Sequence, residues 1–125
     1  MDDVFHSVFS KIDAFVYRCK NDREYTMEVM EGAVTSILGY PKADIIGNAK
    51  VSFVKLTIEE DTERVFAEVD AAIEADEAWD VAYQMKHADG GLVHVRDRGR
   101  GVFVDGELSH LEGMIVNAQA EMSLR

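Results

Sequence analysis

The chain has 125 residues, 47% of them hydrophobic, which is enough for one domain with a buried core. Its formal net charge of −11 repels phosphate backbones and argues against direct binding of nucleic acid. No apolar run reaches the roughly 18 residues of a membrane span, and the acidic first residues do not resemble a secretory signal. The single cysteine, Cys19, excludes an internal disulfide and suits a reducing cytoplasm.

Residues 1–12 are predicted to form a flanking helix ahead of the domain. Apolar side chains recur in this segment at helical spacing, at Val4, Phe5, Val8, Phe9 and Ile12. This stripe is too wide to leave in water, and a helix this short is marginal unless it docks. We therefore expect a homodimer in which a two-fold contact pairs the helix with its copy. Docking on the sheet of the same subunit is the alternative.

The next elements are a hairpin and a series of short helices. Strands are predicted over residues 14–20 and 25–30, with a turn at Asn21-Asp22 between them. A short helix is expected from Val34, stopped by Gly39 in the left-handed conformation. A further helical turn is expected after Pro41, ending at Gly47.

A longer helix follows. Thr57 and Glu60 have the spacing of a capping box, which predicts the start of this helix. Val65, Val69, Ala72 and Ile73 then fall on one face of a helix that runs to about residue 75.

The last part of the chain predicts an antiparallel meander of three strands. Large side chains stand at every second position of residues 79–86, which is the period of a strand with one buried face. Turn signals at 89–91 and 105–106 separate this strand from those predicted over 93–104 and 108–116.

Together these elements predict an α+β domain. A two-stranded hairpin and a three-stranded meander are each too small to bury much apolar surface alone. Joined as one five-stranded antiparallel sheet, with a helical layer on one face, they form a two-layer fold. We expect this domain over residues 13–118, with residues 119–125 starting a C-terminal linker helix.

Two stretches carry a resemblance to a known family. Lys86-His87-Ala88-Asp89-Gly90 followed by Val95-Arg96-Asp97-Arg98-Gly99-Arg100 resembles the C-terminal half of a PAS domain, in the subclass with an Asp-Gly hairpin. Gly39-Tyr40 with Ile45-Ile46-Gly47 is similar to the family's helix-turn-helix signature. The family often exits through Asp-Ile-Thr, where this chain has Asn117-Ala118-Gln119.

The resemblance implies a cytoplasmic sensory module of a bacterial signalling protein, and not an enzyme. Such a module senses a small molecule or couples subunits, and it regulates an output domain such as a diguanylate cyclase or a histidine kinase. The alternative is a ligand-free module for dimerisation or protein interaction.

The resemblance also implies a place for a ligand, between the helical layer and the inner face of the sheet. The residues expected there are Met27, Val29, Phe53, Val65, Val69, Trp79, Val81, Tyr83, Met85, Asp97 and Ile115. Apolar residues at strand and helix periods also simply fill a core, so a filled core is the other interpretation. An inward carboxylate at Asp97 would need a hydrogen-bond donor.

No cofactor, catalytic residue or metal ligand is predicted. A flavin adduct needs a thiol in the helical part of the fold, whereas Cys19 lies on the first predicted strand. Haem needs an axial ligand, and no histidine occurs between Ser7 and Lys86. Neither a nucleophile with a base nor a phosphate-binding glycine loop is recognisable, so no catalytic site is expected. With flavin and haem set aside, a ligand of this domain would be an unidentified small molecule.

A basic stripe stands out in this acidic chain. It consists of His94, Arg96, Arg98 and Arg100, which at period two share one face, expected to be the outer face of the sheet. It fits a solvated face whose members pair with Asp80 or Glu112. It also fits a docking surface for an acidic partner or a terminal helix.

Overall fold

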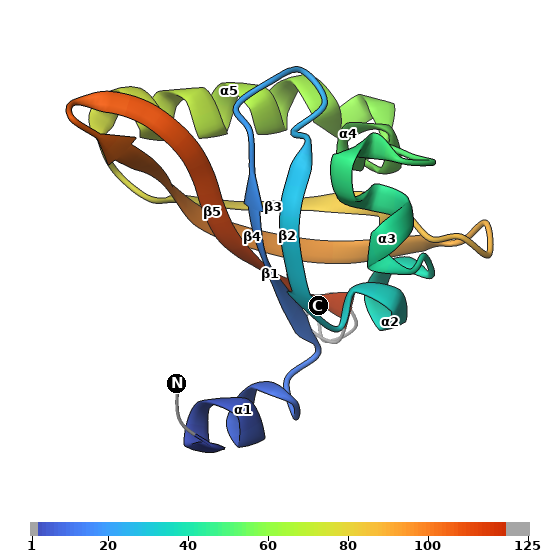
Figure 1. The fold of residues 1–125 in the computed structure, drawn as a ribbon. Helices are drawn as coiled ribbons and strands as arrows, with labels where there is room; N and C mark the ends of the chain where they lie inside the picture. Colours follow the sequence, from blue (N-terminus) through green and yellow to red (C-terminus); the bar gives the residue numbers. More distant parts are fainter. Residues whose placement is uncertain (1–2, 120–125) are drawn as a thin grey trace.

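The computed structural model describes residues 3–119, except for the side chains of Asp3, Phe5 and His6. These residues form one five-stranded antiparallel sheet in the order β2-β1-β5-β4-β3 (Figure 1). The strands are β1 (Ala14–Cys19), β2 (Met27–Gly32), β3 (Trp79–Lys86), β4 (Leu92–Val104) and β5 (Glu107–Asn117). The predicted α+β fold is confirmed.

Helices cover one face of this sheet. The helical segments are α1 (Asp3–Phe9), α2 (Val34–Leu38), α3 (Lys42–Ile45), η1 (Ile46–Asn48), α4 (Phe53–Leu56) and α5 (Glu59–Ala75). Figure 1 shows α5 running along the sheet and α2 to α4 stacked beside it, whereas α1 stands away from the sheet. The core therefore lies between the sheet and the layer from α2 to α5.

Local sequence explains the meander. In β3 buried and solvent-facing residues alternate, as the spacing of its large side chains predicts. Asp105 and Gly106 join β4 to β5 with positive φ angles of 52° and 81°, which match the right-handed twist of a two-residue hairpin. Gly39 ends α2 in the left-handed conformation, as expected.

The second strand differs from its prediction. Tyr25 has a φ of 49° and lies before β2, which begins at Met27. The pairing of β1 with β2 shifts between Arg18 and Cys19, so Glu28 is an extra residue in the ladder. Met27 and Met30 are therefore both buried, and Val29 is turned outward.

The predicted capping box is wrong. The N-cap of α5 is Ile58, which makes no side-chain cap, and its backbone N–H donates to the carbonyl of Gln84. Thr57 instead follows α4 in an extended conformation and forms an isolated bridge with Met85. The connection from α4 to α5 is thus held against β3, which removes the geometry that a capping box requires.

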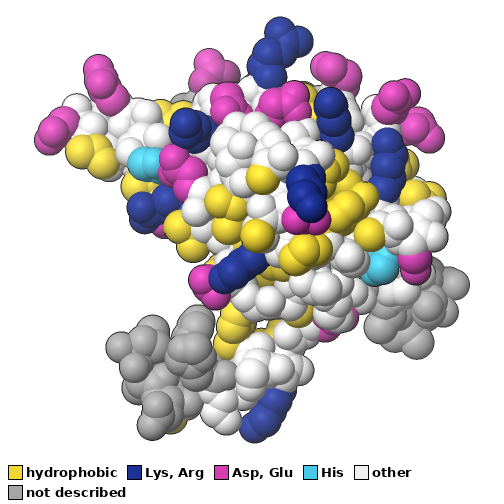
Figure 2. Space-filling view, turned by 45° about the vertical axis from the view of Figure 1, so that its right-hand side comes forward, with side chains coloured by type: hydrophobic (Ala, Val, Ile, Leu, Met, Phe, Trp, Pro, Cys, Tyr) yellow, Lys and Arg dark blue, Asp and Glu magenta, His cyan; other side chains and the backbone are white. Residues whose placement is uncertain are grey.

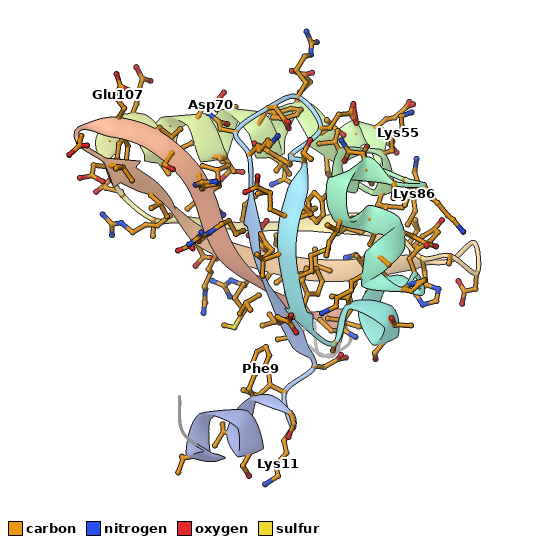
Figure 3. All side chains as sticks on the ribbon, viewed as in Figure 1. Phe9, Lys11, Lys55, Asp70, Lys86 and Glu107 are labelled. Carbon is orange, nitrogen blue, oxygen red and sulfur yellow. The ribbon has the colours of Figure 1, made fainter. Side chains whose placement is uncertain are left out.

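The N-terminal helix is shorter than predicted, because Ile12 lies beyond its end. Val4 and Val8 are 71% and 54% exposed. Phe9 points from α1 toward the end of the sheet (Figure 3), where its ring lies against Gly32. Phe5 lies outside the described side chains.

The two ends of the domain meet. The backbone N–H of Asn117 donates to the carbonyl of Asp13 (2.9 Å), and the Asn117 side-chain amide donates to the Asp13 carboxylate (2.8 Å). This amide therefore joins β5 to the residue that precedes β1. The backbone N–H of Ala118 also donates to the carbonyl of His94 (2.8 Å).

The surface is charged with both signs. In Figure 2 acidic side chains gather along the upper edge, at the level of α5, and basic groups lie among them. No helix within residues 3–119 has the length and apolar character needed to cross a membrane.

Candidate functional site

A buried carboxylate, Asp97, lies on the inner face of the sheet. It belongs to β4 and is 4% exposed. Its Oδ1 accepts hydrogen bonds from the Tyr17 hydroxyl (2.8 Å) and the Trp79 indole N–H (3.1 Å). Its Oδ2 accepts one from the Tyr83 hydroxyl (2.7 Å). Two strands, β1 and β3, thus supply three donors to one carboxylate, and we call these four residues the Asp97 cluster.

Two glycines make room for the cluster. Gly99 and Gly113 are register partners in β4 and β5, and both are placed toward the inner face. A Cβ at Gly113 would lie 2.5 Å from the Tyr17 hydroxyl oxygen, and one at Gly99 would meet the Trp79 ring. The missing side chains let both rings lie close over the sheet, within reach of Asp97.

The electrostatics of the cluster follow from burial. Burial raises the pKa of Asp97. The hydrogen bonds from Tyr83, Trp79 and Tyr17 offset this rise only in part, so the pKa stays above its usual value. Burial, followed by the charge of Asp97, also raises the pKa of Tyr17 and Tyr83 well above the usual value, so both hydroxyls remain donors. The site is therefore a buried acid held by neutral donors.

A small cavity adjoins the cluster. Its volume is about 10 Å³, close to that of one water-sized probe. It is lined by Tyr17, Cys19, Tyr25, Met27, Phe53, Val69, Trp79, Asp97 and Leu111. The Tyr25 hydroxyl is buried and has no hydrogen-bond partner among the described residues. Burial raises the pKa of Cys19 to about 12, so its thiol remains protonated.

The family follows from a match over most of the fold. A family model described as the PAS fold matches residues 27–115, which is more than half of the chain. The chain belongs to the PAS family. A comparison with curated proteins finds no match.

Solved PAS domains share the fold at low sequence identity. The N-terminal domain of a diguanylate cyclase with a PAS/PAC sensor from Marinobacter aquaeolei is 21% identical, with a TM-score of 0.71, covering 87% of this chain and 98% of that chain. A sensory box histidine kinase/response regulator from Burkholderia thailandensis is 19% identical, with a TM-score of 0.75 and coverages of 97% and 88%. A PAS domain of a LuxR-family transcriptional regulator from the same organism, in complex with ethanol, is 19% identical, with a TM-score of 0.67 and coverages of 94% and 97%.

The structure places ten of the eleven predicted pocket residues in the core of this PAS domain. They are Met27, Phe53, Val65, Val69, Trp79, Val81, Tyr83, Met85, Asp97 and Ile115. The inward placement of Val29 is wrong, because the extra residue in β2 turns this side chain to the outer face, where it is 45% exposed. Of the ten, Met27, Phe53, Val69, Trp79 and Asp97 line the cavity.

Sequence reasoning missed four cavity residues, Tyr17, Cys19, Tyr25 and Leu111. The first two had a usable signal, because Phe15, Tyr17 and Cys19 recur at period two along β1 and all face inward. Tyr25 had none, since its inward position depends on an irregular backbone before β2.

The basic stripe shares the outer face of the sheet, as predicted. Arg96 and Arg98 both pair with Asp80, at 2.7 and 3.2 Å, which confirms that partner. Glu112 pairs instead with Arg18, and Arg100 reaches Asp76. Each of these pairs is partly exposed and contributes at most about 1 kcal/mol.

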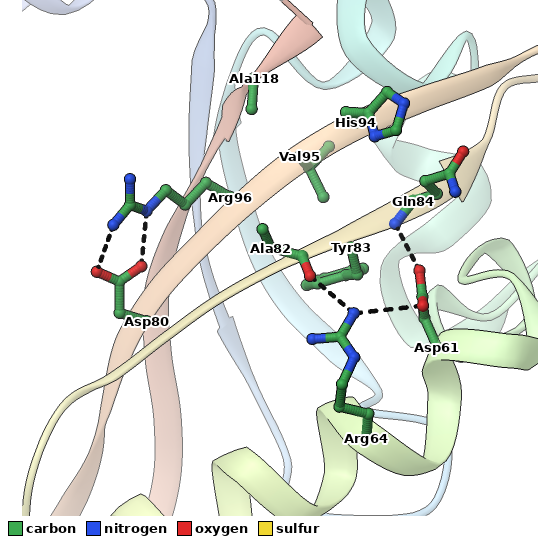
Figure 4. Close-up of a pocket in the computed structure, with 10 residues that line it drawn as sticks. All are labelled: Asp61, Arg64, Asp80, Ala82, Tyr83, Gln84, His94, Val95, Arg96 and Ala118. Carbon is green, nitrogen blue, oxygen red and sulfur yellow. Dashed lines mark hydrogen bonds and ion pairs between the residues drawn. The ribbon is translucent and has the colours of Figure 1, made fainter. Parts of the chain in front are cut away.

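A surface hollow at the free edge of β3 is closed by paired groups (Figure 4). Asp61 accepts from the backbone N–H of Gln84 (2.9 Å), and Arg64 donates to the carbonyl of Ala82 (2.8 Å). These α5 side chains satisfy edge groups that would otherwise be open to another strand. These two side chains therefore protect the edge of β3, and we assign no ligand to the hollow.

No group of three or more His, Cys, Asp or Glu within the described part of the chain is arranged to hold a metal ion. Cys19 belongs to β1 and not to a helix. His87 adjoins the hairpin after β3, and His94 and His110 lie in β4 and β5.

Proposed function

We propose that this PAS domain is a cytoplasmic sensory module that senses a small molecule or couples subunits. In doing so it regulates an output domain, such as a diguanylate cyclase or a histidine kinase, and carries no catalytic site of its own. The buried thiol of Cys19 suits a reducing compartment.

The observation that carries this proposal is the Asp97 cluster. A core built for stability alone is filled by apolar side chains, because taking a carboxylate out of water costs free energy even when it is hydrogen-bonded. Here the carboxylate stands beside a cavity, between the sheet and the helical layer. This is where the family holds its ligands, and a buried polar cluster gives such a site directional selectivity.

The solved neighbours support a sensory function. Two of them are described as a diguanylate cyclase with a PAS/PAC sensor and as a sensory box histidine kinase, and a third is a PAS domain in complex with ethanol. Their likeness to this chain is one of fold, and we extend their sensory function to it as part of the proposal.

The position of the site supports coupling to neighbouring domains. Asp97 pairs with Ile115 on β5, two residues before Asn117. Asn117 in turn bonds Asp13 ahead of β1. A shift of the inner sheet at Asp97 would therefore reach the segments that lead into and out of the domain.

The second candidate is a ligand-free module for dimerisation. Two observations favour it. The cavity has the volume of about one water molecule, and α1 exposes Val4 and Val8 without a covering surface among the described residues.

Native mass spectrometry of the purified protein separates the two candidates. The sensory function predicts a bound small molecule that copurifies, or one taken up from a small-molecule library, with less bound to Asp97→Asn. Asp80→Asn, on the outer face, is the matched control and should bind as the wild type does. Wild-type protein that carries no ligand and takes up none would favour the dimerisation module.

A further inference from the structure

When Asp97 is ionised, the Asp97 cluster carries a negative charge that has no positive partner among residues 3–119. Within residues 3–119, the three donors that reach Asp97 are neutral side chains, from Tyr17, Trp79 and Tyr83. Neutral donors orient a carboxylate but leave its charge uncompensated in a medium of low dielectric. An ionised Asp97 thus favours a cation beside it.

The hydrogen-bonding capacity of the site is also unfilled. A carboxylate offers about four lone-pair positions, and the three donors leave one on Oδ2. Across the same cavity, the Tyr25 hydroxyl has no hydrogen-bond partner among the described residues, although the residue is only 6% exposed. Tyr25 and Asp97 both line this small cavity, and a ligand with several N–H donors could satisfy the Tyr25 hydroxyl and the remaining position on Oδ2.

The remaining walls are aromatic. The rings of Tyr17, Tyr25, Phe53 and Trp79 all line the cavity, and Tyr17 stacks on Phe53 with centroids 6.3 Å apart. Ring faces attract cations through their quadrupole, and cages of aromatic rings with a carboxylate bind ammonium groups in this way. Aromatic walls offer no comparable attraction to an anion.

We propose that this cavity binds an ammonium-type cation, with ammonium itself as the best fit. The inference rests on the proposed sensory function and names its ligand class. The volume of about 10 Å³ admits a species the size of water, and ammonium has that size. Methylammonium requires the rings to move apart, and tetramethylammonium is too large and has no N–H to donate.

A water molecule is the competing occupant, since it can also bridge Oδ2 and a hydroxyl. The two differ in charge. If water occupies the cavity, added ammonium salts do not bind there. A cation site binds ammonium saturably and loses affinity for it when the carboxylate is replaced.

Trp79 provides a direct readout, because it is the single tryptophan of the chain and lines the cavity. Its fluorescence is measured at neutral pH during titration with ammonium chloride. Sodium chloride at equal ionic strength controls for screening, and tetramethylammonium chloride controls for size. We expect a saturable change with ammonium, a weaker one with methylammonium and none with the two controls.

Three variants test the residues. Asp97→Asn should weaken binding by about tenfold or more, because a charged acceptor is replaced by a neutral one. Tyr25→Phe removes a hydroxyl that bonds no described residue, so it should fold normally and still bind about tenfold more weakly. Asp80→Asn, on the outer face, should bind as the wild type does.

A wild-type titration without saturation, or one that sodium chloride reproduces, would overturn the inference; so would undiminished affinity in Tyr25→Phe. If the protein takes up another small molecule in native mass spectrometry but does not bind ammonium, only the ammonium proposal is wrong. If the protein takes up neither, the proposed ligand-sensing function is wrong as well.

Discussion

At the residue scale, Asp97 makes the stability of the protein depend on pH in an unusual direction. Burial raises its pKa in the native state above the value of about 3.9 for an unfolded chain. The native state then binds a proton more tightly than the unfolded state does. The free energy of unfolding therefore falls as the pH rises from about 3.9 through the raised native value, and this loss is absent at lower pH.

We predict that the wild type loses stability relative to Asp97→Asn as the pH rises through that window. Exposed carboxylates with a lowered pKa, such as Asp80 and Asp89, act in the opposite direction but are present in both proteins, so they cancel in the difference. Urea unfolding of both proteins, from about pH 4 to pH 8, measures this difference. A difference that does not vary with pH would show that the pKa of Asp97 is not raised.

Trp79 contributes both packing and a hydrogen bond, and two substitutions separate them. Trp79→Ala should destabilise the protein by about 3–5 kcal/mol, because the indole is 3% exposed in the core. Trp79→Phe keeps much of the ring but removes one donor to Asp97, and should cost about 1–3 kcal/mol. Urea midpoints measure both. Asp80→Ala, at the next position but exposed, is the control; a Trp79→Ala protein no less stable than this control would contradict the packing assignment.

At the element scale, the close approach of β4 and β5 to the aromatic rings requires glycine. Gly113→Ala would place a Cβ 2.9 Å from the carbonyl oxygen of Arg98, as well as against Tyr17. Backbone cannot give way cheaply, so we expect a loss of about 1–3 kcal/mol. Gly91→Ala is the matched control, because its Cβ meets a flexible Asp89 side chain at 3.1 Å. Equal thermal shifts for the two variants would rule out the spacing argument.

The elements predicted from sequence are those with a regular period. The bounds of β3 agree with its prediction at both ends, because alternation and the following turn leave one register. The β2 segment fails at the extra Glu28, since a bulge breaks period two without any sign in composition. The capping-box prediction is wrong because Thr57 forms a bridge with Met85, which is a contact between segments far apart in the chain.

Trp79, Tyr83 and Asp97 of the candidate site are predicted from the sequence, whereas Tyr17 and the bonding of the carboxylate are not. Alternation with the basic stripe predicted an inward Asp97, and the structure confirms it. Its Tyr17 donor comes from 80 residues away in the chain, and such a pairing depends on the strand order of the finished sheet. The inward position of Tyr25 depends instead on a local backbone irregularity, which the sequence does not reveal either.

At the scale of the whole molecule, α1 remains the expected dimer contact. Val4 and Val8 are exposed, and Ile12 is 44% exposed just beyond the helix. Phe9 lies against Gly32 of its own domain, so its part in the contact is smaller than the sequence suggested. We predict that removal of residues 1–11, or Phe5→Glu combined with Phe9→Glu, gives a folded monomer.

Sedimentation velocity at tens of micromolar measures the state of each protein. Val4→Glu with Val8→Glu is a second variant that leaves the Phe9 packing intact and should also be monomeric. A wild type that is already monomeric, or a truncated protein that stays dimeric, would exclude this contact.

We propose that the Asp97 cluster is coupled to both ends of the domain. The most direct test is amide hydrogen exchange of Asn117 and Ala118, whose N–H groups bond Asp13 and His94. We predict that Asp97→Asn changes the exchange rates of these two amides by about tenfold or more, whereas Asp80→Asn leaves them unchanged. Changes confined to the neighbours of residue 97, with both amides exchanging as in the wild type, would contradict the account.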